Sequence, residues 1–145
     1  MKTVTQSLMA LMLLMGLFTS SVVLAGDTSP HKIVIQVSTD DPRTQKIALN
    51  NAVNLQKALG QDNVVIEIVA YGPGLGMLTS SSKEGPRITS LAMQDIKFSA
   101  CGNTMKGIEK KTGKMPVLLD GVTVTEAGVL RIMELQEQGY AYVRP

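Results

Sequence analysis

Short apolar stretches alternate along this chain with longer amphipathic ones. Lys32–Ser38 and Val64–Ala70 are rich in β-branched apolar residues, which is typical of strands buried inside a sheet. Between them, the apolar positions follow one face of a helix: Ala48, Ala52, Leu55 and Leu59. Asp41 is placed to cap this helix, with Pro42 at its first position and Gly60 at its end. The first half therefore predicts strand, helix, strand.

The second half repeats this alternation. Helices are predicted around Pro86–Gln94, over Asn103–Thr112, and after a capping Thr125. The apolar face of that last helix consists of Val129, Ile132, Met133 and Leu135. Three further strands are predicted: Ile96–Ala100, Val117–Leu119 with a turn at Asp120-Gly121, and Tyr140–Val143. Such alternation predicts a mainly parallel sheet with helices on both faces.

Sites in sheets of this kind gather at the carboxyl ends of the strands. The segments expected at that edge are Asp40–Arg43, Tyr71–Met77, Cys101–Thr104 and Asp120–Val122.

The beginning of the chain has the pattern of a secretory signal peptide. Lys2 precedes an uninterrupted apolar run, Leu8–Phe18, and Val23-Leu24-Ala25 places small residues where signal peptidase requires them. We therefore expect residues 1–25 to be removed before Gly26 and residues 26–145 to form one domain in the periplasm. An uncleaved N-terminal anchor is the alternative.

Composition excludes several classes of function. The formal net charge is only +2 and the chain has no Trp, which argues against nucleic-acid and membrane-surface binding. His31 is the single histidine, and a strand of about 20 Å, at roughly 3.3 Å per residue, would separate it from Cys101. A Cys–His hydrolase is therefore not expected.

Binding motifs are weak as well. No cluster of cysteine, histidine and carboxylate has zinc spacing, and the methionines are scattered as core residues are. Gly72–Gly76 contains Pro73 and lacks the phosphate-binding glycine pattern, so a structural turn is the simpler interpretation. No cofactor and no metal is predicted.

Cys101 is the residue that needs an explanation. It is the single cysteine of an exported domain and sits where a strand gives way to a helix. The N–H groups of a helix start stabilise a thiolate, and Gly102 leaves the sulfur uncrowded. Asn103 and Thr104 can donate hydrogen bonds, and Lys106 follows one turn later. The alternative is a buried cysteine that packs as a small apolar residue.

Ile96–Ile108, with Cys101 and Gly107, resembles the active-cysteine segment of the DsrE/DsrF-like sulfur-relay family. The opening strand, the glycine-rich loop and the C-terminal GVLRIMELQEQGYAYVRP agree with this resemblance. It implies a three-layer α/β/α fold with a mainly parallel five-stranded sheet and assembly as trimers or hexamers. It also implies that Cys101 carries sulfur as a persulfide. Because the chain has no second cysteine, a relay partner would be another protein or a small sulfur compound.

The leading hypothesis is thus a periplasmic sulfur carrier that loads sulfane sulfur on Cys101. Arg43, Asn103, Thr104 and Lys106 are the candidates for stabilising its thiolate. The rival hypothesis is an oligomeric binding or assembly module with a structural cysteine. A redox protein that forms intermolecular disulfides is a third, for which the chain lacks a Cys-x-x-Cys pair.

Overall fold

Five parallel strands form one sheet in the order β4-β3-β2-β1-β5 in the computed structural model, which describes residues 29–145. Two pairings of the first three strands are extensive, since β1 pairs with β2 along its whole length and β2 with β3 over five residues. The signal peptide expected over residues 1–25 lies outside the described residues. The strands are β1 (His31–Val37), β2 (Val64–Ala70), β3 (Ile96–Cys101), β4 (Val122–Thr125) and β5 (Ala141–Val143).

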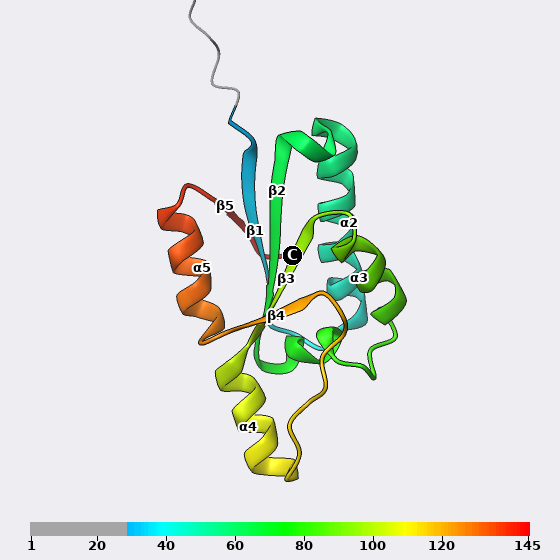
Figure 1. Ribbon diagram of the computed structural model, residues 1–145, viewed down its shortest axis with the longest axis vertical. Coiled ribbons are helices and arrows are strands. Elements are labelled where there is room, and N and C mark those ends of the chain that lie inside the picture. The colour runs from blue at the N-terminus through cyan, green and yellow to red at the C-terminus, as the bar shows by residue number, and fades with distance from the viewer. Residues whose placement is uncertain (1–28) are drawn as a thin grey trace, which may run out of the picture.

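Helices cover both faces of the sheet, which confirms the three-layer α/β/α architecture (Figure 1). On one face, α2 and α3 bury the larger apolar core. On the other, α5 buries a smaller cluster of four residues: Val34, Val69, Ile132 and Leu135. The remaining helix, α4, extends away from the sheet beyond its carboxyl edge (Figure 1). The helices are α2 (Pro42–Leu59), α3 (Gly85–Ala92), α4 (Gly102–Thr112) and α5 (Gly128–Glu137), with 3₁₀ segments η1 (Gln61–Asn63) and η2 (Gly72–Leu78).

The predicted start and end of α2 are confirmed. Asp41 accepts a hydrogen bond from the Thr44 N–H at 2.8 Å, which satisfies one of the donors left free at a helix start. Pro42 is the first helical residue, where its missing N–H has no cost. Gly60 ends the helix with a φ of +88°, a conformation that favours glycine.

The predicted fourth strand, Val117–Leu119, is wrong. Its residues run antiparallel to the end of η2, where the Ser80 N–H donates to the Val117 carbonyl at 2.9 Å and the Leu119 N–H donates to the Leu78 carbonyl at 3.0 Å. The strand that joins the sheet is β4, five residues later. Since β4 is a short edge strand that is buried on neither face, its sequence VTVT has a weaker apolar signal than the segment before it.

Two further predictions change with β4. The segment Asp120–Val122 precedes and opens that strand, so it lies at the amino edge of the sheet and not at the carboxyl edge. Thr125 ends β4 and does not cap the next helix, because α5 is capped at Ala127. No helix among residues 29–145 combines the length and the apolar character needed to cross a membrane.

Candidate functional site

Cys101 lies where two helices begin. It is the last residue of β3 and the N-cap of α4, and it stands opposite Thr125, the last residue of β4, in the sheet. Its neighbour Ala100 belongs to the core under α2 and α3, so Cys101 is on the α5 face. Its exposed fraction is 6%. Both α4 and α5 start from this edge, which brings the positive ends of two helix dipoles to one sulfur.

The pKa of the Cys101 thiol is lowered although the residue is buried. Burial is the largest influence and raises the pKa, because a charged sulfur loses hydration. The Thr104 hydroxyl and the backbone N–H groups of Thr104, Gly128 and Asn103 together outweigh it. The Cys101 side chain makes no capping hydrogen bond to α4, and the Asn103 N–H also donates to the Glu126 carbonyl, so these groups lower the pKa together and not through one short contact. The site therefore stabilises the thiolate form of Cys101 more than water does.

The Thr104 hydroxyl is oriented by its neighbour. Its Oγ1 accepts a hydrogen bond from the Gly72 N–H at 3.0 Å. A hydroxyl has one proton, and with Oγ1 accepting from Gly72 that proton is available to the sulfur. This contact also ties the start of η2 to the first turn of α4. The loop after β2 thus contributes to the cysteine site through one hydrogen bond.

The connection from β4 to α5 passes very close to the cysteine. The Asn103 N–H donates to the Glu126 carbonyl at 3.1 Å, which binds this connection to α4. A Cβ on Gly102 would lie 3.0 Å from the Thr125 carbonyl oxygen and 3.3 Å from that of Glu126. Glycine allows this close approach of two backbone segments, which a Cβ would force apart by a few tenths of an ångström.

The Tyr71 ring packs against the start of α5, where the connection from β4 ends. A Cβ on Gly128 would lie 2.9 Å from Cδ1 of the Tyr71 ring, so the ring rests directly on the first residue of α5. Cys101 is therefore surrounded by three loop-to-helix junctions, those that follow β2, β3 and β4.

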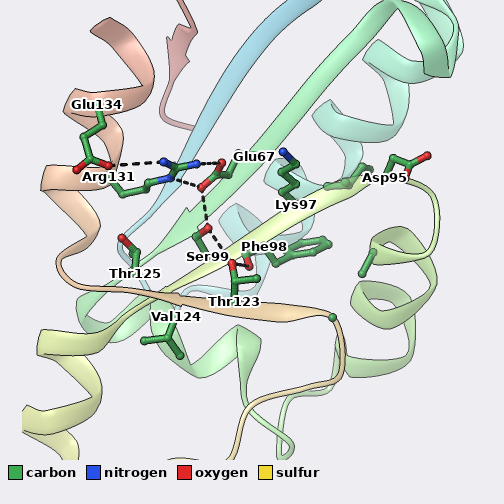
Figure 2. A pocket seen from close by; sticks show the side chains of 13 residues that line it. Glu67, Asp95, Lys97, Phe98, Ser99, Thr123, Val124, Thr125, Arg131 and Glu134 are labelled. Carbon is green, nitrogen blue, oxygen red and sulfur yellow. Dashed lines mark hydrogen bonds and ion pairs between the residues drawn. The ribbon is translucent and has the colours of Figure 1, made fainter. Parts of the chain in front are cut away.

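An open groove of about 540 Å³ runs along the same face of the sheet, between α5 and the pair β3–β4. Figure 2 shows Arg131 reaching from α5 to Glu67, with Ser99 between Glu67 and Thr123. Glu67 is buried in the central strand β2, and two nitrogens of Arg131 donate to its two oxygens, each at 2.8 Å. Thr125 lines the groove too, so the groove reaches the strand position opposite Cys101.

The predicted auxiliary residues fall into two groups. Thr104 contacts the site through its hydroxyl, and Asn103 through its backbone, while the Asn103 side chain is exposed. Lys106 is exposed on α4. Arg43 is exposed at the start of α2 and borders a separate shallow groove with Lys46. In the part of the chain that the structure describes, no three side chains of His, Cys, Asp or Glu are grouped to hold a metal ion.

Gly128 is the site residue that the sequence interpretation missed. The signal was present in the glycine that follows the β-branched run Val122–Thr125. Placing the fourth strand too early put a different loop at the carboxyl edge and hid this glycine.

The fold and part of the sequence are shared with solved structures. No protein-family model matches the chain, and no curated protein does. The protein of unknown function MTH1491 from Methanobacterium thermoautotrophicum is 32% identical over 79% of this chain and 99% of its own, with a TM-score of 0.72. The ychN protein from E. coli is 14% identical over 81% of this chain and 99% of its own, with a TM-score of 0.61, and shares the fold. This chain therefore belongs to the same family as MTH1491 and has the DsrE/F-like α/β fold.

Proposed function

We propose that this protein is a sulfur carrier that holds sulfane sulfur as a persulfide on Cys101. The observation that carries the proposal is the position of the nearly buried Cys101 at the start of α4, opposite the end of β4 and near the start of α5, where the surrounding groups lower its pKa. These groups stabilise a thiolate, which is the form of cysteine that attacks sulfur. The DsrE/F-like fold supports the same assignment.

Loading and unloading are two exchange reactions of the same kind. The Cys101 thiolate attacks the outer sulfur of a persulfide or polysulfide, the S–S bond of that donor breaks, and the remainder of the donor leaves as a thiolate. Unloading reverses this, because an acceptor thiolate attacks the outer sulfur and Cys101 leaves as the thiolate. The sulfane sulfur moves without net oxidation, so neither step needs a cofactor. With Cys101 only 6% exposed, the donor must be small or must present its sulfur on a narrow extended segment.

Export and assembly belong to this proposal. The N-terminal pattern supports export to the periplasm, where the sulfur donor and acceptor would be partner proteins or small sulfur compounds. Assembly as a homo-oligomer, trimer or hexamer, is supported by apolar side chains on the outer face of α5. Val129, Leu130 and Met133 are exposed there.

Mass spectrometry of the intact protein tests the carrier function. After incubation with a polysulfide donor and removal of excess reagent, the mass should rise by one sulfur atom and return to its initial value with a reductant. Cys101→Ser is the matched control and should gain nothing. An unchanged mass of the native protein, under conditions that load a free low-pKa thiol, would contradict the proposal.

The burial of Cys101 favours a second candidate function, an oligomeric binding module in which the cysteine only packs as a small apolar residue. In such a module, Cys101→Ser would leave partner or ligand binding intact, and the thiol would react with alkylating reagents only after unfolding.

A further inference from the structure

Glu67 is buried in the middle of the sheet, and the proposed sulfur transfer does not use its carboxylate. Only 1% of the residue is exposed, and Oε1 accepts from both Arg131 Nε at 2.8 Å and Ser99 Oγ at 2.7 Å. Oε2 accepts from Arg131 Nη2. A buried pair of this kind is often no more stabilising than well-packed apolar residues of the same size. Its presence therefore suggests a role in geometry.

Arg131 sits in the first turn of α5. Its N–H donates to the Ala127 carbonyl at 2.9 Å, which closes the turn that begins with Gly128. The later residues Ile132 and Leu135 pack in the apolar cluster on the same face, and apolar contacts alone allow a helix to shift or rotate slightly. A two-pronged hydrogen-bonded pair fixes direction as well as distance.

The same network reaches the other strands beside Cys101. Ser99 lies two residues before Cys101 on β3 and so points to the same face of the sheet. Its hydroxyl is 3.4 Å from that of Thr123 on β4. Glu67 thus connects β2, β3 and α5 directly, with β4 following through Ser99 (Figure 2).

We propose that Arg131 and Glu67 are positioning residues that lock the first turn of α5 against Cys101 and keep the Gly128 N–H directed at its sulfur. Neither residue is among the groups that contribute most to the thiol pKa. Arg131 Nη1 also lies 3.6 Å from Glu134 Oε2, so one cation is shared between a buried and a partly exposed carboxylate. We infer that the Arg131–Glu67 pair acts mainly by fixing the position of α5, and a variant that keeps the charge of Arg131 separates this effect from the field of the charges. This inference deepens the proposed carrier function and rests on it.

The pH dependence of Cys101 alkylation by a small reagent, measured without any sulfur donor, tests the inference. Arg131→Met nearly keeps the length of the side chain and removes the guanidinium group, which donates to both oxygens of Glu67. The midpoint of its alkylation profile should rise by about one pH unit, the effect of losing one hydrogen bond to a charged group. Arg131→Lys keeps the positive charge but has one nitrogen where arginine donates from two, and it should not restore the native midpoint. Arg87→Met, on a partly exposed arginine bonded to Asn50, is the control and should match the native protein.

An Arg131→Met protein that is folded by circular dichroism and has the native midpoint would overturn the inference. Full restoration by Arg131→Lys would overturn it too, because charge would then suffice. If Arg131→Met does not fold, the nearly isosteric Glu67→Gln decides: the midpoint should rise, and an unchanged midpoint refutes the positioning role. Failure of sulfur loading in the native protein would refute the carrier function while leaving these midpoints interpretable.

Discussion

Gly102→Ala tests the close approach that builds the cysteine site. The added methyl group would lie 3.0 Å from the Thr125 carbonyl oxygen, 3.3 Å from the Glu126 carbonyl oxygen and 3.4 Å from Val124 Cγ1. Two of these three neighbours are backbone atoms, which cannot swing away as a flexible side chain can. The connection between β4 and α5 would have to move away from Cys101.

The expected cost follows from overpacking. Forcing a methyl group into a filled site destabilises a protein by about 1–3 kcal/mol. Gly107→Ala in the same helix is the matched control, since nothing lies within 4 Å of its added methyl group. There the substitution should stabilise by roughly 0.5–1 kcal/mol, because alanine favours the helix.

Urea unfolding, followed by circular dichroism, gives the free energy of unfolding of both variants. The two can be compared directly if this free energy falls with urea concentration at the same slope. The unfolding free energies of the two should differ by at least about 1 kcal/mol, because the preference of the helix for alanine is common to both variants and the overpacking at Gly102 remains. Gly102→Ala should also raise the pH midpoint of Cys101 alkylation, because the Gly128 N–H moves with the connection. If Gly102→Ala is as stable as Gly107→Ala and alkylates as the native protein does, the close approach does not shape the site.

Three further predictions concern single contacts. Thr104→Val should raise the pKa of Cys101 and Thr104→Ser should preserve it, since only serine keeps the hydroxyl; alkylation against pH measures both. The pKa of Glu67 in the folded protein is below the ordinary value of 4.5, so its contribution to stability is present above that pH and is lost as the pH falls through the folded value. As the pH is lowered, the urea midpoint of unfolding should therefore fall less steeply for Glu67→Gln than for the native protein. Gly74→Ala, whose methyl group would collide with the Val37 carbonyl, should lower the melting temperature, whereas Gly76→Ala has open space and should not.

Most of the fold could be predicted because the buried strands carry strong signals. β2 is covered on both faces and is apolar except for Glu67, and the buried part of β1 carries the apolar run Ile33–Ile35. The edge strand β4 could not be found this way, since none of its four residues is buried. The fourth strand was instead predicted at the apolar segment Val117–Leu119, which pairs with the end of η2 and not with the sheet.

The site was predicted through its cysteine and less well through its partners. Cys101 at the end of a strand and the start of a helix was visible in the sequence, and Thr104 was singled out beside it as a hydrogen-bond donor. Charged side chains suggested Arg43 and Lys106, yet both are exposed. The groups that act on the sulfur include backbone N–H groups, and the sequence marks the one at Gly128 only indirectly, by a glycine that follows the run Val122–Thr125.

The ionisation of Cys101 in the native protein decides whether this cysteine can act as a sulfur carrier. Thiolate absorbance in the far ultraviolet can be titrated against pH, and the same titration of Cys101→Ser subtracts the contribution of the tyrosines. Since the chain has one cysteine, the difference belongs to Cys101 alone. We expect a midpoint below that of the same thiol in the unfolded protein. A midpoint at or above the unfolded value would contradict this expectation, because burial would then outweigh the converging donors.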